Sequence, residues 1–320
     1  MFIKLQKSWY SVMENNIVET LKKHSINILF GEKLSKHTTL NIGGPAKYFV
    51  YIENIQQLID VLSIAKFYNE KVFIIGAGSN LLVSDKGFDG IVIKLKKDFT
   101  TIDIDEEKVI AYSAVMLPML INTTVEHSLS GLEELFGIPG SVGGAIIMNA
   151  GTKTASISDC LEQIEVVKID EPEQGIIKLS KEQINFQYRS SGLENKYVIV
   201  SAQFHLKKSD KEILKKKLNE VLLKRIQTQP LGTFNAGCIF KNPYGTESEI
   251  TAAKLIESAG LKGFSIGGAC VSEKHANFII NKNNATCEDF LELIRYIIKV
   301  VKEKYNIELQ PEITFVGIEL

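Results

Sequence analysis

Hydrophobic positions along the chain follow two periods, and the changes of period divide it into three blocks. In the first block, apolar residues at helical spacing begin near Asn54, and four apolar runs around them are typical of strands. These runs are 46–52, 72–75, 81–84 and 90–95. The pattern predicts a βαββ unit. Ahead of it, Ser11 and Glu14 have the spacing of a capping box, which predicts an N-terminal helix.

The second block, from about 99 to 207, is richer in strands. Its expected strands are 100–104, 109–114, 164–169, 176–179 and 197–206. One helix, 117–129, interrupts them. Ser209 and Glu212 then have capping-box spacing, so we expect a charged helix to begin there. Its apolar stripe consists of Ile213, Leu214, Leu218, Val221 and Leu222.

The last block alternates helices and strands. We expect helices at 250–258, which Gly260 closes, and at 286–305, with strands at 275–281 and 313–316. The whole pattern predicts an α+β fold. The chain is expected to divide into a lead-in at 1–35, units at 36–98 and 99–208, and a C-terminal unit at 209–320.

Charge and composition exclude several classes of function. The 320 residues carry 37 Lys plus Arg against 38 Asp plus Glu, so no strong field attracts nucleic acid or anionic lipid. No stretch reaches the roughly 18 apolar residues of a membrane span. The four cysteines are scattered singly, which indicates a reducing, cytoplasmic compartment, and the five histidines never pair at ligand spacing, so no metal site is expected.

A first glycine loop follows the expected strand 72–75. It consists of Gly76, Ala77, Gly78, Ser79 and Asn80, and its two glycines would let backbone N–H groups approach a phosphate. Leu81 stands where a Rossmann fingerprint has its third glycine, so that fold is not expected. A plain turn that needs glycine for positive φ remains an alternative.

A second loop, 137–151, holds five glycines within fifteen residues. Such density favours backbone lying against a flat or phosphorylated ligand. Two loops of this kind about sixty residues apart indicate a dinucleotide. The alternative is close packing of a helix on a sheet through Gly143, Gly144 and Ala145.

Seven segments, in order, resemble the UDP-N-acetylenolpyruvoylglucosamine reductase family. They are TTLNIGGPAKYF, IGAGSNLLVSDKGFDGIVI, GLEELFGIPGSVGGAIIMNAG, YRSS, NAGCIFKNP, GLKGFSIGGACVSEKHANFIIN and QPEITFVG. The form of HANFIIN resembles the subgroup that lacks an extra tyrosine-bearing loop. Together the segments span nearly the whole chain.

The resemblance implies a vanillyl-alcohol-oxidase-type (PCMH-type) FAD fold, in which 36–98 and 99–208 are two lobes and 209–320 is a substrate domain. It implies reduction of UDP-N-acetylglucosamine enolpyruvate in peptidoglycan precursor synthesis, with NADPH as hydride donor and a monomer favoured. The implied FAD contacts are Gly76, Ala77, Gly78, Ser79, Asn80, Leu81, Gly140, Ser141, Gly143, Gly144, Asn149 and Arg225. The implied substrate contacts are Tyr188, Lys241, Asn242, Lys262 and His275.

Three residues match the family's catalytic positions. Arg189 is expected to stabilise the enolate that forms when hydride adds to the substrate. Glu312 would repel that charge, so we expect it to be protonated or paired with a cation. Cys238 stands where the family usually has the serine that donates a proton. Two alternatives stay open: another flavin enzyme of the same fold, and an FAD- or nucleotide-binding module without turnover.

Overall fold

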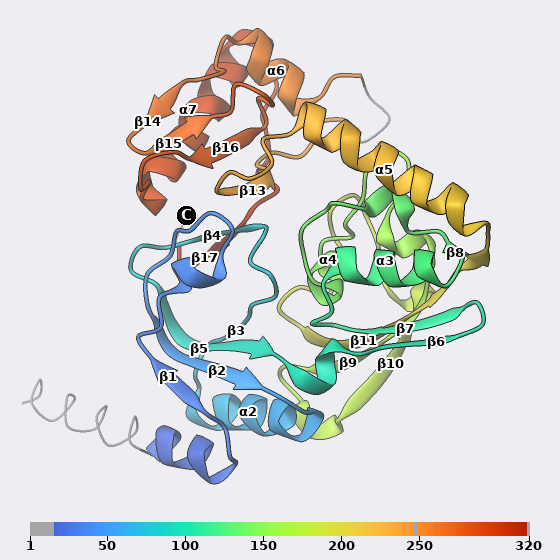
Figure 1. Ribbon diagram of the computed structural model, residues 1–320. Helices are drawn as coiled ribbons and strands as arrows, with labels where there is room; N and C mark the ends of the chain where they lie inside the picture. The colour runs from blue at the N-terminus through green and yellow to red at the C-terminus, as the bar shows by residue number, and fades with distance from the viewer. Residues whose placement is uncertain (1–15, 246–248, 319–320) are drawn as a thin grey trace, which may run out of the picture.

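The structure, a computed structural model, describes residues 16–245 and 249–318 of the chain. Figure 1 shows three bodies: a blue N-terminal lobe, a green lobe beside it and an orange C-terminal domain above the first. Residues 16–23 are helical, with Ile17 and Leu21 buried. The capping box expected at Ser11 and Glu14 lies outside the described residues.

The first lobe is built on a four-stranded sheet with the order β1-β2-β5-β3. Its strands are β1 (Ile28–Phe30), β2 (Ala46–Ile52), β5 (Phe88–Leu95) and β3 (Val72–Ile74). β2, β5 and β3 run parallel, and α2 (Ile55–Tyr68) packs against β2. The Asn54 side chain caps α2 by accepting from the Gln57 N–H, so the expected helix begins where the sequence placed it.

One strand of the expected βαββ unit pairs elsewhere. β4 (Leu81–Val83) lies parallel to β17 (Thr314–Val316), the last strand of the chain. The C-terminal segment therefore returns to the end of the first glycine loop.

The second lobe has a five-stranded antiparallel sheet with the order β10-β9-β11-β7-β6. Its strands are β6 (Ile102–Asp105), β7 (Lys108–Tyr112), β9 (Leu161–Lys168), β10 (Ile176–Ser180) and β11 (Tyr197–His205). α4 (Val142–Ile147) packs on β7 and β11, and α3 (Leu117–Glu126) packs beside it. The expected helix 117–129 ends early because Ser128 has a φ of 60° and Leu129 enters β8 (Leu129–Ser130), which pairs with β12 (Lys207–Lys208).

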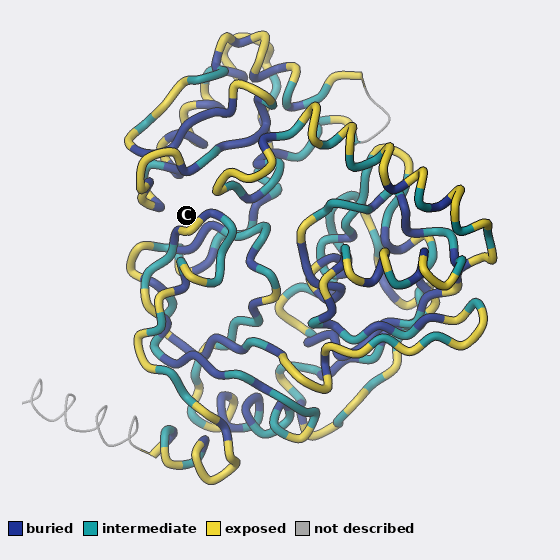
Figure 2. Tube along the Cα trace, viewed as in Figure 1, coloured by how far each residue is buried: buried dark blue, intermediate teal, exposed yellow. Residues whose placement is uncertain are grey.

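α5 (Lys211–Thr228) connects the second lobe to the C-terminal domain (Figure 1). The expected cap was wrong: Asp210 accepts from the N–H groups of Glu212 and Ile213, and Ser209 lies one residue outside the cap. Only Leu214 and Leu218 of the expected stripe are buried, while Ile213 is 65% exposed. Figure 2 shows the helix largely exposed along its outer side.

The C-terminal domain is an antiparallel sheet with the order β13-β16-β15-β14, covered by two helices. The strands are β13 (Asn235–Cys238), β14 (Ser265–Ile266), β15 (Ala269–Val271) and β16 (Phe278–Asn281); the helices are α6 (Ala252–Ser258) and α7 (Cys287–Tyr305). Thr286 and Asp289 form a capping box at the start of α7, which buries Phe290, Ile294 and Val301. Six 3₁₀ turns complete the described elements: η1 (Leu34–His37), η2 (Lys97–Thr100), η3 (Glu133–Leu135), η4 (Ile157–Asp159), η5 (Pro172–Gln174) and η6 (Lys181–Gln183).

The C-terminal domain is fixed to the first lobe by polar and apolar contacts. The Thr39 hydroxyl donates to the Asn235 carbonyl at 2.6 Å, and the Asn281 amide donates to the Leu40 carbonyl at 2.9 Å. Leu40, Ile42 and Leu82 belong to the same apolar cluster as α6 and α7. No described helix has the length and apolar character needed to cross a membrane.

Candidate active site

The two glycine loops meet in space. The Ser79 hydroxyl donates to the Pro139 carbonyl at 2.8 Å. A Cβ at Gly76 would lie 2.5 Å from the Ser141 hydroxyl oxygen, so a side chain there would displace that hydroxyl. Segments about sixty residues apart in sequence therefore line one place, as expected for a single ligand held by both.

Some glycines of these loops are needed by the fold itself. Gly78 has a φ of +67°, and a Cβ there would overlap the His37 carbonyl oxygen. A Cβ at Gly143 would lie 3.0 Å from Cβ of Ser113, where α4 packs on the second sheet. At Gly78 the turn needs a positive φ, and at Gly143 a helix packs closely on a sheet. These are the two alternatives that the sequence left open. Cofactor contact by either stays a prediction.

Other expected cofactor residues shape the same loops. The Ser141 hydroxyl caps α4 by accepting from the Gly144 N–H at 3.3 Å, and Gly140 precedes it with a φ of +159°. Ala77 is partly buried in the first loop, and Leu81 begins β4. All five residues therefore belong to the two loops or directly follow them.

Two buried oxygens at the second loop have no protein partner among the described residues. Asn149 donates through Nδ2 to the Gln187 carbonyl at 3.0 Å, but its Oδ1 accepts nothing, and neither does the hydroxyl of Ser113. Buried polar atoms are rarely left unsatisfied in proteins. An unpaired acceptor beside a glycine cradle fits a ligand with ring N–H groups, such as a flavin.

Arg189 lies in a tight turn in which Gln187 and Ser190 exchange backbone hydrogen bonds. Its φ of 58° is unusual for a residue other than glycine, and such strain is concentrated at functional sites. Nε pairs with Oε1 of Glu312 at 2.8 Å, and Nη2 donates to the Gly151 carbonyl at 2.8 Å. The second glycine loop and the segment that precedes β17 together fix this guanidinium.

Glu312 is paired with the cation Arg189, one of the two alternatives stated for it, and its pKa is raised. Its side chain is only 14% exposed, and burial raises the carboxyl pKa while Arg189 and Lys241 oppose the rise. Its main chain is held on both sides: its N–H donates to the Ile239 carbonyl at 2.7 Å, and its carbonyl accepts from the Asn80 amide at 3.1 Å. Asn80, expected to contact a cofactor, thus also positions Glu312.

Cys238 ends β13 and is partly buried. Burial, reinforced by the negative charge of Glu312, raises the pKa of its thiol to about 12, and the cations Arg189 and Arg225 act in the opposite direction. The sulfur therefore lies within electrostatic reach of both expected catalytic partners. Near neutral pH it carries a proton.

Arg225 lies in the last turn of α5. Burial lowers its pKa, and its Nη1 donates to Oε1 of Gln229 at 3.2 Å. Its side chain packs on Gly137 of the second glycine loop, where a Cβ would lie 2.8 Å from Cδ of Arg225. A cofactor contact by Arg225 stays a prediction, and the effect of its charge on the Cys238 thiol was not expected from the sequence.

Three expected substrate residues form one group. The Tyr188 hydroxyl accepts from the Asn242 N–H at 3.3 Å, and burial raises the Tyr188 pKa. The Asn242 side chain accepts from the Ala252 N–H at 3.1 Å, so it also holds the start of α6. The main-chain N–H of Lys241 donates to the Gln310 carbonyl, two residues before Glu312.

The other two expected substrate residues form a separate group. Lys262 pairs with Glu257 at 2.6 Å, and His275 has a lowered pKa because of burial and the nearby charge of Lys262. Within the described chain, no hydrogen bond or ion pair joins either side chain to Arg189 or Glu312.

Asn277 was missed by the sequence reasoning. It is buried, and its side chain and main chain hold the two residues that follow Cys238. The only available signal was an asparagine between apolar residues in Ala276-Asn277-Phe278, because a buried amide must find partners.

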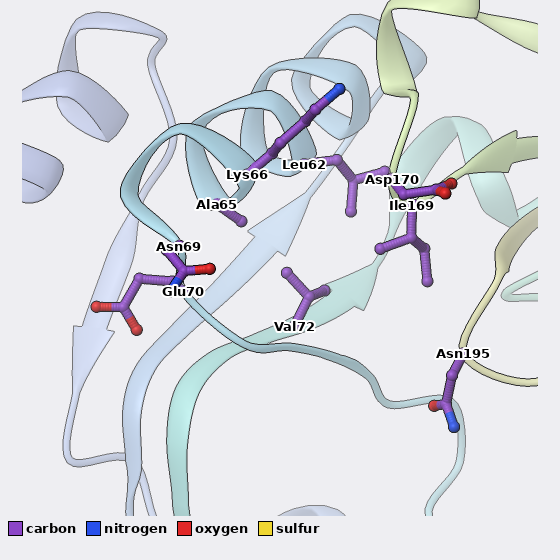
Figure 3. A pocket seen from close by; sticks show the side chains of 9 residues that line it. All are labelled: Leu62, Ala65, Lys66, Asn69, Glu70, Val72, Ile169, Asp170 and Asn195. Carbon is purple, nitrogen blue, oxygen red and sulfur yellow. The ribbon is translucent and has the colours of Figure 1, made fainter.

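A pocket of about 260 Å³ lies elsewhere, between α2 and the chain that follows β9 (Figure 3). Lys66, Asp170 and Asn195 line it around an apolar floor of Leu62 and Val72. None of the expected site residues borders it.

Sequence profiles of known families match two parts of the chain. Residues 46–171 match an FAD binding domain, and residues 229–316 match the C-terminal domain of UDP-N-acetylenolpyruvoylglucosamine reductase.

Complete relatives are similar along their length. UDP-N-acetylenolpyruvoylglucosamine reductase of Caldanaerobacter subterraneus subsp. tengcongensis is 41% identical, covering 96% of this chain and 98% of the relative. The Clostridium novyi enzyme is 42% identical over 89% of this chain and 91% of its own length. The crystal structure of the Thermus caldophilus enzyme superposes with a TM-score of 0.78 at 34% identity, covering 91% of this chain and 99% of that one. The expected fold class, α+β with a two-lobed FAD fold, is confirmed.

Proposed function

The chain belongs to the UDP-N-acetylenolpyruvoylglucosamine reductase family, and we propose that NADPH is its reductant and Cys238 its proton donor. The family's reaction is the flavin-dependent reduction of UDP-N-acetylenolpyruvoylglucosamine to UDP-N-acetylmuramate in peptidoglycan precursor synthesis. We place the reaction in the cytoplasm and favour a monomer. The four free cysteines support this location, because disulfides are rare in the reducing cytoplasm.

Bound FAD would supply the hydride-transfer chemistry between the nicotinamide and the substrate. The residues that would hold it are the two meeting glycine loops, from Gly76 to Leu81 and from Gly140 to Gly144. Oδ1 of Asn149 offers an acceptor, and Arg225 offers a cation beside Gly137.

Arg189 would bind the carboxylate of the enolpyruvyl group. When hydride adds to the methylidene carbon, the electron pair of the double bond moves toward the carbon that bears the carboxylate. A guanidinium fixed at Nε and Nη2 meets that charge without reorganising, because Glu312 and the Gly151 carbonyl already hold it. Nη1 is left for the substrate.

Cys238 would then complete the reduction. Its S–H bond breaks, the proton forms a C–H bond at the carbon beside the carboxylate, and the electron pair stays on sulfur. Arg225 and Arg189 favour the thiolate, which solvent reprotonates. The observation that carries the proposal is the ion pair of Arg189 with Glu312 at 2.8 Å, whose two charges both act on the Cys238 thiol.

Tyr188, Lys241 and Asn242 lie next to this chemistry and are proposed to hold the sugar and the diphosphate. Lys262 and His275 form the second group and are proposed to bind a more distant part of the nucleotide. Each offers N–H or O–H donors of the kind that phosphate and uracil oxygens accept.

The test uses the purified protein with its bound flavin under anaerobic conditions. We expect NADPH to bleach the yellow absorbance, and UDP-N-acetylenolpyruvoylglucosamine to restore it. Enolpyruvate compounds without the nucleotide sugar serve as the control and should not restore it. Equal bleaching by NADH would contradict the NADPH assignment, and failure of the substrate to restore colour would contradict the reaction.

A further inference from the structure

A row of three polar side chains lies beside the first glycine loop and has no part in the chemistry proposed above. The Glu32 carboxylate contacts Nε2 of His37 at 3.1 Å, and Nδ1 of His37 lies 3.4 Å from Nζ of Lys94. The imidazole stacks on the Phe49 ring with centroids 4.4 Å apart, and it is only 10% exposed. The row therefore joins η1 and the residues before it to β5.

The contact with Lys94 determines which nitrogen of His37 carries the proton. An ammonium can only donate, so Nδ1 must be the acceptor. Nε2 then carries the ring proton and donates it to Glu32. Burial, together with the charges of Lys94 and Lys36, lowers the His37 pKa, which agrees with a neutral ring. The neutral imidazole therefore holds the Lys94 ammonium from one side.

Lys94 is partly buried, and its charge is not balanced. Within the described part of the chain, no carboxylate forms an ion pair with Lys94 or Lys96. The Glu32 carboxylate is separated from Lys94 by the imidazole and is shared with Lys36, 3.3 Å away. Burial lowers the Lys94 pKa, and the charge of Lys96, whose Nζ lies over the Tyr51 ring, lowers it further. Because buried cations are normally paired, this arrangement fits a site for a negatively charged ligand.

Lys94 stands at the carboxyl end of β5, where the first glycine loop begins. β3 runs parallel to β5, and the Ile75 N–H donates to the Ile93 carbonyl at 2.9 Å, so Gly76 follows directly. Ile91 and Ile93 pack in the cluster of α2, so Lys94 points to the opposite face of the sheet. The arrowheads of β2 and β5 in Figure 1 point toward the second lobe. Ligands commonly bind at the carboxyl ends of parallel strands.

The main chain around His37 also touches the first glycine loop. The Thr39 N–H donates to the Gly78 carbonyl at 3.1 Å, and a Cβ at Gly78 would overlap the His37 carbonyl oxygen. The loop and the imidazole are therefore fixed relative to each other. This arrangement places the backbone N–H groups of the loop and the Lys94 ammonium at the same end of the sheet.

We propose that Lys94 is a phosphate-binding cation of the FAD site and that Glu32 and His37 are its positioning residues. The proposal rests on the proposed placement of FAD at the two glycine loops. FAD carries two negatively charged phosphates, and backbone N–H groups supply only partial positive charge. Lys94 adds a full charge where the first loop begins. Because the imidazole already holds the ammonium, little side-chain freedom is lost when a phosphate binds.

The experiment measures flavin binding by the full-length protein after dialysis against potassium bromide has removed its flavin. Flavin fluorescence gives the Kd for FAD and for riboflavin, which has no phosphate. We expect Lys94→Met to raise the Kd for FAD about 10- to 100-fold, the effect of losing a hydrogen bond to a charged group. Riboflavin binding should change less than about twofold. Lys94→Arg, which keeps the charge, should bind FAD within about fivefold of the parent.

Potassium chloride gives a second readout. It should weaken FAD binding less in Lys94→Met than in the parent, because salt screens the charge pair that this variant lacks. The matched control is Lys97→Met, which removes an exposed lysine of the same segment that pairs with Glu53. We expect this control to bind FAD within about twofold of the parent, with the same dependence on salt.

His37→Phe tests the positioning role. Phenylalanine keeps a ring against Phe49 but offers no acceptor to Lys94. We expect the Kd for FAD to rise about three- to tenfold, with riboflavin binding unchanged. In a Lys94→Met background, His37→Phe should weaken FAD binding no further. An equal loss in both backgrounds, or no loss in either, would overturn positioning through Lys94.

Gly144→Asp tests the placement of FAD separately. Gly144 is exposed, and a Cβ there would meet only the Ser141 hydroxyl oxygen, at 3.4 Å, so the fold accommodates the side chain. Its negative charge in the second loop should weaken FAD binding at least about tenfold. Unchanged binding in Gly144→Asp would show that the proposed placement is wrong. The role of Lys94 is overturned if Lys94→Met binds FAD within twofold of the parent, or raises the Kd for FAD and riboflavin equally.

Discussion

The roles proposed for Cys238, Arg189 and Glu312 require that one proton stays on sulfur and that one positive charge stays fixed. Burial keeps the thiol protonated, and Glu312 holds the guanidinium while itself being paired. A charge that is already oriented costs no reorganisation when the substrate becomes anionic. In the proposed mechanism, the three side chains therefore act as a unit.

Alkylation of Cys238 tests its protonation state. A thiol with a pKa of about 12 is thiolate in roughly one molecule in 10,000 at pH 8. Iodoacetamide should therefore label Cys238 slowly there, and the rate should rise about tenfold per pH unit up to pH 10. Mass spectrometry of the labelled peptide measures this, with Cys238→Ser as control. A rate that levels off near pH 9 would contradict the raised pKa.

Substitution of Arg189 by lysine tests the geometry of the cation. Lysine keeps the charge but has no planar fork that engages Glu312 and the Gly151 carbonyl together. We expect reoxidation by substrate to slow about 100- to 1,000-fold, with flavin reduction nearly unchanged. Arg295→Lys, an exposed partner of Glu288, is the control. Equal slowing of both half-reactions would show that Arg189 holds the flavin instead.

Much of this site could be predicted from the sequence, but only because motifs marked its positions. Arg189, Cys238 and Glu312 were singled out from YRSS, NAGCIFKNP and QPEITFVG. The partner of Glu312 could not be identified, because residues 189 and 312 meet through tertiary folding. Asn277 was not predicted, because its side chain acts by hydrogen bonding to the backbone of Phe240, and no sequence pattern indicates such a bond.

Sequence patterns predicted which segments form helices and strands. They were less successful at predicting where a helix begins or ends and which strands pair. The helical spacing of apolar residues predicted α2, α5 and α7. Before α5, however, Ser209 and Asp210 are adjacent, and both are residue types that can cap a helix. Backbone geometry, which the sequence alone does not display, makes Asp210 the cap. β4 was expected as a strand, but its pairing with β17 joins segments about 230 residues apart.

The cap of α5 gives a paired test. Asp210→Ala should lower the free energy of unfolding by about 1 kcal/mol, because two helix N–H groups lose their acceptor. Ser209→Ala should change it by much less. Denaturant unfolding of the two variants measures the difference. A larger loss of unfolding free energy in Ser209→Ala than in Asp210→Ala would contradict capping by Asp210 and support the capping box predicted from the sequence.

The docking of the C-terminal domain on the first lobe brings Glu312 to the glycine loops. Besides the Thr39 and Asn281 bonds, the Asp85 carboxylate accepts from the Cys287 N–H at 2.9 Å. A side chain of the first lobe therefore satisfies a free N–H at the start of α7. Such contacts join residues that are far apart in the sequence. The sequence therefore predicted the three units but not the contacts between them.

Removal of Asp85 tests this joint. Asp85→Ala should cost about 1 kcal/mol of stability and speed amide hydrogen exchange in the first turn of α7. Asp89→Ala, whose side chain is 90% exposed, is the control. Unchanged exchange at α7 in Asp85→Ala would contradict a role for this bond in docking.

The most direct test compares both half-reactions of Cys238→Ala and Cys238→Ser by anaerobic stopped flow. We predict that NADPH reduces the flavin of both variants at nearly the parent rate. Only Cys238→Ala should then fail to be reoxidised by UDP-N-acetylenolpyruvoylglucosamine, because serine retains a transferable proton. Reoxidation of the alanine variant at the parent rate, or equal loss of both half-reactions, would contradict proton donation from Cys238.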